Sequence, residues 1–294
     1  MTMTNIKQRF GGIAFLLLLI SIPSWMFAAE NPHLDNISRA LEASTLPRAE
    51  QAEVKAGAAA AIRAGVPAED VEIVVSRSLG RGADAGTINR FLTTSVSVKK
   101  EGLPVGPVLD RIEQGLSKGV PTKRVADASE RFAEKLGAAR TLVETLIQGG
   151  MAPWRGTERD EAMVSGARAL DKSIPEEAIN GIGAAVRGRR GSWPLFTRAM
   201  DTASYFAARG MSVQTASHLV RNAVEKGYSE KDLDAMVRSL DAEIKKGTRV
   251  EDVAAKMARE DMRDARGIVR EDIRQDMKTD HSRGAGSGVG GRGR

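Results

Sequence analysis

Three six-residue stretches of this 294-residue chain nearly repeat one another, and they begin 54 residues apart. They read LSKGVP from Leu116, LDKSIP from Leu170 and VEKGYS from Val224, and a weaker copy, IRAGVP, begins at Ile62. Self-similarity at a fixed period is typical of repeat proteins, whose units are stable only when they pack on their neighbours. The period therefore predicts a tandem array of similar units.

The repeated stretches have the chemistry of helix ends. Glycine, as at Gly65, adopts the left-handed conformation that closes a helix. Val66 and Val71 have the spacing of a hydrophobic staple, and Pro67 between them suits a helix start because its φ is preset. Similar ends, each with glycine or a substitute, recur at positions 65, 82, 102, 119, 137, 156, 173, 191, 210, 227 and 247.

The segments between these ends have the apolar spacing of amphipathic helices, at i, i+3, i+4 and i+7. We therefore predict an all-α fold of tandem helical repeats, either α-solenoid-like or a compact helical array. The period resembles those of the armadillo, HEAT and tetratricopeptide classes, but the tryptophan, leucine-glycine and tyrosine pattern of tetratricopeptide repeats is absent. The resemblance therefore assigns no functional residue.

The helices can be grouped in threes or in pairs. Four copies of a 54-residue three-helix unit, at residues 48–101, 102–155, 156–209 and 210–263, explain the repeated stretches. A two-helix unit of about 36 residues fits most of the same ends, since both lengths are multiples of a helix and its connector. We prefer the three-helix unit because intervals of 17, 18 and 19 residues recur in that order across residues 102–210.

Four segments flank the predicted repeat domain of residues 48–263. Residues 1–29 have the pattern of a signal peptide, and residues 30–47 contain a short leading helix. Residues 264–282 carry alternating charges and are predicted to form a solvated helix. Residues 283–294 are rich in glycine and arginine and are predicted to be disordered.

The signal-peptide prediction depends on three features of the first 29 residues. Lys7 and Arg9 make a positive start, residues 13–22 are an apolar run, and Ala28 and Ala29 are small enough for cleavage. The run is too short to span a bilayer, which needs about 20 apolar residues. We expect cleavage near Ala28 or Ala29 and a periplasmic or secreted protein, the alternative being an uncleaved anchor or a buried helix.

The formal net charge of +6 is not a property of the predicted repeat domain. Two of these charges belong to Lys7 and Arg9 and three to arginines of the tail, so residues 30–282 carry +1. A nucleic-acid-binding domain should instead show a basic stripe on its folded surface. Nucleic acid is therefore not expected on the folded body, and association with anions or nucleic acid is confined, as an alternative, to the Arg/Gly tail.

Five residues are candidate partner contacts. Trp154 and Trp193 each lie beside a proline in a predicted turn, and tryptophan is common at binding hot spots. The alternatives are that they cap the ends of the helical stack or serve as glycan-stacking platforms. Arg187, Arg189 and Arg190 form a basic cluster that could bind an anion, although a helix C-terminus is the preferred interpretation.

No catalytic, metal-binding or cofactor-binding motif stands out in the sequence. His33, His218 and His281 are scattered and the chain has no cysteine, whereas zinc ligands come in close-spaced pairs. Glu158 and Asp160 open a predicted helix, where carboxylates stabilise the dipole, and catalysis by them is the less favoured interpretation. We predict no cofactor and no metal.

The function predicted from these features is that of an exported, non-enzymatic α-helical repeat protein, a protein-interaction or scaffold module of the bacterial cell envelope that binds an unknown protein partner. The first alternative is a cell-wall glycan-binding protein or envelope enzyme that uses Trp154 and Trp193, with Glu158 or Asp160 as acid. The second is binding through the Arg/Gly tail.

Overall fold

The structure is a computed structural model, and it describes residues 31–259. Within that range the chain forms twelve α-helices and no strand, as the apolar spacing predicts. In chain order they are α1 (Pro32–Glu42), α2 (Arg48–Arg63), α3 (Ala68–Gly80), α4 (Ala85–Lys100), α5 (Gly106–Ser117), α6 (Thr122–Gln148), α7 (Glu158–Asp171), α8 (Glu176–Gly188), α9 (Trp193–Ala208), α10 (Val213–Glu225), α11 (Glu230–Lys245) and α12 (Val250–Arg259).

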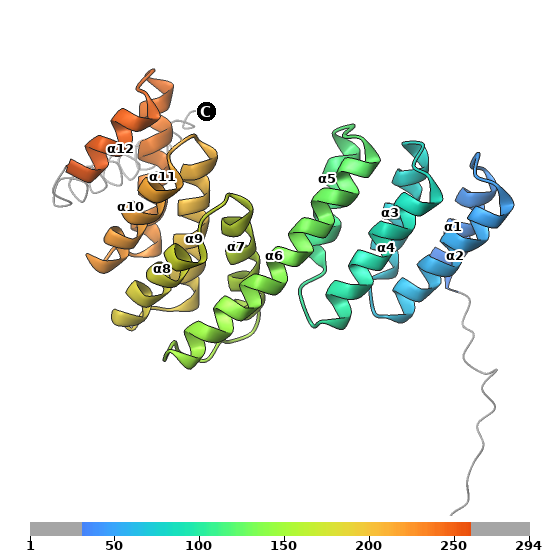
Figure 1. The fold of residues 1–294 in the computed structure, drawn as a ribbon, viewed down its shortest axis with the longest axis horizontal. Helices are drawn as coiled ribbons and strands as arrows, with labels where there is room; N and C mark the ends of the chain where they lie inside the picture. Colours follow the sequence, from blue (N-terminus) through green and yellow to red (C-terminus); the bar gives the residue numbers. More distant parts are fainter. Residues whose placement is uncertain (1–30, 260–294) are drawn as a thin grey trace, which may run out of the picture.

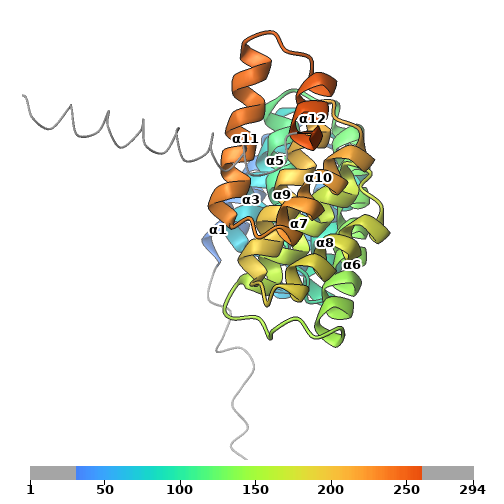
Figure 2. The same ribbon diagram turned by 90° about the vertical axis from the view of Figure 1, so that its left-hand side faces the viewer.

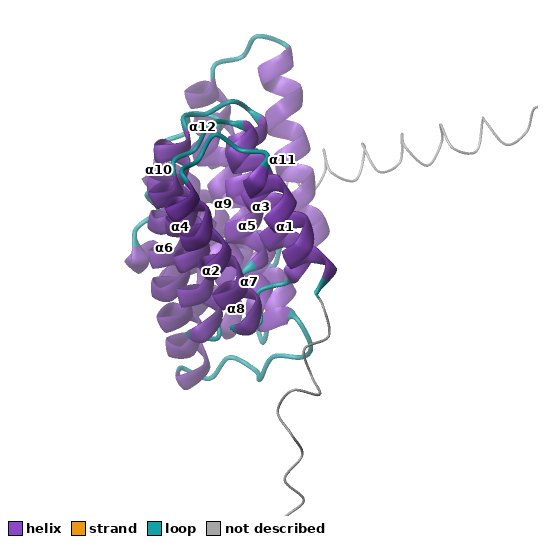
Figure 3. Cartoon of the chain, turned by 90° about the vertical axis from the view of Figure 1, so that its right-hand side faces the viewer, coloured by secondary structure: helices purple, strands orange, loops and turns teal. Residues whose placement is uncertain are grey.

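The helices form an elongated two-layer array that runs from α1 and α2 at one end to α11 and α12 at the other (Figure 1). Viewed along this axis, the odd-numbered helices α1, α3 and α11 lie on one side and the even-numbered α4, α6 and α10 on the other (Figures 2 and 3). Most helices pack against the next helix and against the second one along the chain. The buried apolar side chains between the layers form one continuous core, from Ile37 to Ala254.

The helix ends follow the predicted chemistry at most positions. After α10, Gly227 has a φ of 98° and the backbone N–H of Tyr228 donates to the carbonyl of Ala223 at 3.0 Å, which closes the helix. Ser173 takes the left-handed conformation in place of glycine, with a φ of 61°. Near position 191 the left-handed residue is Arg190, one residue before the predicted glycine.

The predicted helix end at position 137 is wrong, because α6 continues through Gly137. The residues after Gly137 are Ala138, Ala139 and Arg140, which favour a helix and include neither an apolar staple nor a proline or serine. A glycine inside a helix costs only about 1 kcal/mol relative to alanine, which a packed helix tolerates. The chain leaves the helix instead at Gly149 and Gly150, the latter with a φ of 101°.

Polar contacts within each layer recur at a separation of 36 residues. Asn36 donates to Glu72 at 2.9 Å, Asn89 to Glu53 at 2.9 Å and Tyr205 to Asp241 at 2.7 Å. Each of these bonds joins a helix to the second helix along the chain. The contacts therefore follow helix pairs, and the structure does not confirm the preferred 54-residue unit of three helices.

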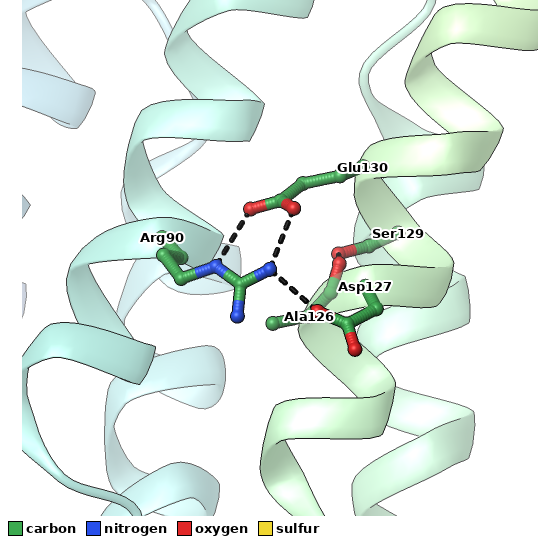
Figure 4. Close-up of polar contacts among 5 residues, drawn as sticks. All are labelled: Arg90, Ala126, Asp127, Ser129 and Glu130. Carbon is green, nitrogen blue, oxygen red and sulfur yellow. Dashed lines mark hydrogen bonds and ion pairs between the residues drawn. The ribbon is translucent and has the colours of Figure 1, made fainter.

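The contact between α4 and α6 shows how such a bond is built. The Arg90 guanidinium donates to both Glu130 oxygens, at 2.8 and 2.6 Å, and to Asp127 at 2.6 Å (Figure 4). A planar guanidinium matches a carboxylate in this two-bond geometry. The hydrogen bonds lower the pKa of Asp127 and raise that of Arg90.

The segments outside residues 31–259 include several predicted features. The signal peptide of residues 1–29, the charged helix of residues 264–282 and the tail of residues 283–294 all lie outside the described residues, as does the end of the repeat domain. None of the described helices combines the length and apolar character that crossing a bilayer requires.

Candidate binding cleft between α5 and α9

The odd-numbered layer is interrupted between α5 and α7. The pairs α1–α3, α3–α5, α7–α9 and α9–α11 are packed together, whereas α5 and α7 are not closely packed. The long helix α6 connects the two sides, because it packs against α4 and α5 and also against α7 and α8 (Figure 1). We call this interruption the seam.

A cleft of about 450 Å³ opens at the seam. Its walls come from α5 and α9, and side chains of α6 and α7 also line it. The lining is of mixed polarity, with aromatic side chains beside charges of both signs. The residues are Pro107, Asp110, Arg111, Gln114, Phe132, Arg168, Asp171, Lys172, Asp201, Ser204, Tyr205 and Ala208.

An ionic triad joins the helices across the seam. Asp171 at the end of α7 accepts a hydrogen bond from Arg111 Nη2 of α5 at 2.7 Å and one from Lys135 Nζ of α6 at 2.9 Å. The Arg111 guanidinium also lies over the ring of Phe132, with its Cζ 4.6 Å from the ring centroid. The side chains of Arg111, Lys135 and Asp171 are each no more than about a third exposed, so their attraction is less screened than on an open surface.

The triad keeps Asp171 ionised. Burial by itself raises the pKa of this carboxyl, but the hydrogen bonds and positive charges of Arg111 and Lys135 outweigh burial and lower the pKa to about 2. Two cations therefore share one carboxylate, which leaves the triad with one positive charge in excess.

The α9 wall is held by contacts within the odd-numbered layer. Arg168 of α7 lies 3.9 Å from Asp201 of α9, a loose pair at the limit of an ion pair. Tyr205 donates to Asp241 of α11 at 2.7 Å, and Arg209 donates to the Tyr205 oxygen. The tyrosine is thereby fixed at the edge of the cleft.

Two charges at the cleft have no ion-pair partner among the described residues. Asp110 is exposed on α5, and Lys172 is exposed directly after α7. Asp110 also contributes to raising the pKa of Asp70 at the start of α3, after the larger effects of burial and Glu69. One acidic charge on α5 and one basic charge at the C-terminal end of α7 thus face the cleft without an ion-pair partner among the described residues.

Of the two tryptophans predicted as partner contacts, the structure buries Trp193 and exposes Trp154. Trp193 is 2% exposed, packs edge-to-face on Phe196 with ring centroids 5.8 Å apart, and donates from Nε1 to the Ala152 carbonyl at 2.7 Å. Trp154 is 40% exposed, in the loop that contains Ala152, with the Arg159 guanidinium 5.6 Å from its ring centroid. The buried Trp193 therefore offers no contact surface but anchors the loop that presents Trp154.

The arginine cluster is dispersed over neighbouring helix ends. Arg189 donates to the carbonyls of Val224 and Glu225 at the end of α10, both at 3.3 Å. Arg187 packs against Gly149 at the end of α6, and Arg190 is exposed. Arg187 in the last turn of α8 and Arg189 directly after it thus lie at the C-terminus of their own helix, and both also reach the C-terminal ends of neighbouring helices.

The remaining candidates are also separate from one another. Glu158 accepts a hydrogen bond from the Arg155 backbone N–H at 2.7 Å, and Asp160 lies 3.7 Å from Arg159. His33 lies 2.7 Å from Glu72 and His218 lies 3.3 Å from Asn222, while His281 is outside the described residues. Among residues 31–259 no three side chains of the histidine, cysteine or carboxylate type come together as a metal site.

Sequence reasoning did not find the cleft. Asp171 and Lys172 belong to the repeated stretch that begins at Leu170, and the sequence explains that stretch by the chemistry of a helix end alone. Arg111, Phe132 and Lys135 were not singled out, because they are ordinary residues of amphipathic helices. Because a helix end was wrongly predicted at Gly137, the sequence also did not predict that the long helix α6 crosses the seam.

Comparison of the chain with protein-family models, with curated proteins and with solved structures gives no match.

Proposed function

We propose that this chain is an exported, non-enzymatic α-helical repeat protein that acts as a protein-interaction or scaffold module of the bacterial cell envelope. The observation that carries the proposal is the cleft at the seam, where charged and aromatic side chains of four helices meet. Stacked helices present extended surfaces to partners, and the cleft has the size of a binding pocket. Two of its lining side chains, Arg111 and Asp171, are held by the ionic triad, so ordering these two on binding costs little.

The grouping of helices into 54-residue units is retained only as a proposal about how the sequence arose by duplication. The repeated stretches at Leu116, Leu170 and Val224 support it. The contacts between helices are equally compatible with a succession of pairs, because most helices pack against the second one along the chain, α5 and α7 being the exception.

Site-specific photo-cross-linking in the native cell envelope tests the interaction. A photoreactive residue replaces Gln114, which is exposed and lines the cleft, and the matched control places it at Lys55, which is exposed on α2. We expect a discrete adduct from position 114 and none of that mass from position 55. The proposal is wrong if position 114 yields no adduct.

Export is tested by the mass of the chain recovered from an envelope or periplasmic extract. We expect a protein that lacks about the first 29 residues, because the small residues Ala28 and Ala29 follow the apolar run. A full-length chain found only in the cytosolic fraction would contradict export and leave the cleft proposal unaffected.

A further inference from the structure

We propose that the seam cleft binds a helix of a partner protein that carries an acidic side chain flanked by basic ones. This inference rests on the proposed function, since it specifies the chemistry of the partner. It starts from the arrangement of the cleft. Because α5 and α9 form its walls and α6 and α7 line it between them, the cleft is an open place within a layer made of helices.

We assign a helix to the partner because the walls of the cleft are themselves helices of the odd-numbered layer, whose usual neighbours are helices. Elsewhere α3, α5, α9 and α11 each lie beside another odd-numbered helix, and those neighbours are joined by polar contacts. A partner helix that crosses the opening from α5 to α9 would give α5 a polar neighbour on the side where α7 is not closely packed. A volume of about 450 Å³ is too small to enclose a helix, so the occupant lies over the opening and inserts side chains.

The charges of the lining decide what those side chains are. Arg111, Arg168 and Lys172 are basic, and Asp110, Asp171 and Asp201 are acidic, so a ligand of a single sign would meet as much repulsion as attraction. Arg111 and Asp171 are already joined in the triad, whereas Arg168 and Asp201 form only a loose pair at 3.9 Å that a ligand can separate. The charges that can face a ligand are therefore Asp110 on the α5 wall, Asp201 on the α9 wall, Arg168 on α7 and Lys172 directly after it.

These four charges define a pattern for the partner helix. An acidic side chain at its centre would face Arg168 and Lys172, and basic side chains to either side would face Asp110 and Asp201. On one face of a helix such residues are three or four positions apart. The expected pattern is a lysine or arginine, then a glutamate three or four positions later, then a second lysine or arginine at a similar interval.

The test is the binding of synthetic helical peptides to the full chain, measured by fluorescence anisotropy at low and physiological salt. One peptide has the pattern Lys-x-x-Glu-x-x-x-Lys, a second has all three charges reversed, and a third carries three lysines. We expect the first to bind at least about tenfold more tightly than the others, and its affinity to fall as salt rises. Equal binding of all three peptides would overturn the inference.

A charge reversal locates the binding site. Lys172→Glu should weaken the first peptide about tenfold and strengthen the reversed peptide, because Lys172 is exposed and has no ion pair among the described residues. Lys118→Glu is the matched control, since Lys118 holds the same place in its repeated stretch but does not line the cleft. Equal effects of the two changes would exclude the cleft as the site.

Failure of this inference is distinguishable from failure of the proposed function. If no peptide binds while position 114 still cross-links a partner in the envelope, the cleft is an interaction surface for a partner of different chemistry, and the inference alone is wrong. If position 114 yields no adduct, the proposed function is wrong as well. Circular dichroism of Lys172→Glu checks that the variant retains its helices.

Discussion

Gly227 shows how single residues connect neighbouring helix ends in this fold. Its φ of 98° ends α10, and its lack of a Cβ leaves room for the Arg189 guanidinium. From that position Arg189 donates to the carbonyls of Val224 and Glu225. A side chain at position 227 would therefore disturb both the backbone of α10 and the arginine that caps it.

Gly227→Ala is predicted to destabilise the chain by about 2–3 kcal/mol, because alanine is strained at positive φ and its Cβ would overlap Arg189. The control is Gly210→Ala, which has almost the same φ, 97°, but open space around the added Cβ. It should cost only about 1 kcal/mol. Urea denaturation measures both. In an Arg189→Ala background the two changes should cost the same, and equal costs in the unaltered chain would contradict this account.

At the scale of the helix, α6 is the element that most distinguishes this array from a regular one. It has 27 residues and meets helices on both sides of the seam. Apart from the nearby backbone of α6 itself, no heavy atom of the described residues lies within 4 Å of the position that a Cβ on Gly137, near the middle of the helix, would take. The helix therefore continues through this glycine without any packing that requires it.

Gly137→Ala is predicted to stabilise the chain by about 0.5–1 kcal/mol, because alanine loses less backbone entropy in a helix and meets no neighbour here. Gly119→Ala provides the comparison, since Gly119 ends α5 with a φ of 72° and should lose stability on the same change. Thermal unfolding followed by circular dichroism measures both. A loss of stability in Gly137→Ala would mean that the chain does leave the helix at this position.

Gly227 and Gly137 also show which helix ends can be predicted from the sequence and which cannot. Helix ends depend on a few adjacent residues, so Gly227 with its following Tyr228 and Ser229 is recognisable locally. Gly137 lies at the interval expected for a helix end, but no apolar staple, proline or serine follows it, so the interval alone gave a wrong prediction. The pairing of helices depends on contacts 36 residues apart, which the repeated stretches do not encode.

The candidate contacts were harder to predict for the same reason. Trp154 and Trp193 have similar local surroundings, each beside a proline. Trp193 begins an amphipathic helix and points into the core with Phe196, whereas Trp154 belongs to no apolar stripe. The helical spacing of apolar residues could therefore have predicted that Trp193 is buried and Trp154 is not. No comparable signal marks Asp171, whose role depends on Arg111, 60 residues away in sequence.

At the scale of the whole molecule, the seam divides the array into two stacks that are joined by α6 and by the Asp171 triad. In repeat proteins each unit is stabilised by its nearest neighbours, so a weak interface separates regions that unfold independently. The stacks α1–α5 and α7–α12 should therefore depend on α6 and on the triad together for unfolding as one unit.

Asp171→Asn is predicted to destabilise the chain by about 1–3 kcal/mol at pH 7, because Arg111 and Lys135 lose their shared counter-ion. The folded-state pKa of about 2 lies below the ordinary 3.8, so the ionised carboxyl stabilises the fold above pH 4. This contribution is lost as the pH falls toward 2. The difference between the two proteins in urea denaturation should therefore shrink between pH 4 and pH 2, and a difference unchanged over that range would contradict the assignment.

Native-state hydrogen exchange tests the coupling of the stacks directly. With rising urea, the most protected amides of α1–α5 and α7–α12 should converge on one opening free energy in the unaltered chain and on two in Asp171→Asn. Asp201→Asn is the control, because the Arg168–Asp201 distance of 3.9 Å makes that pair weak and both residues lie in the α7–α12 stack. If Asp201→Asn separated the stacks as fully as Asp171→Asn, the triad would not be the connection that makes the array cooperative.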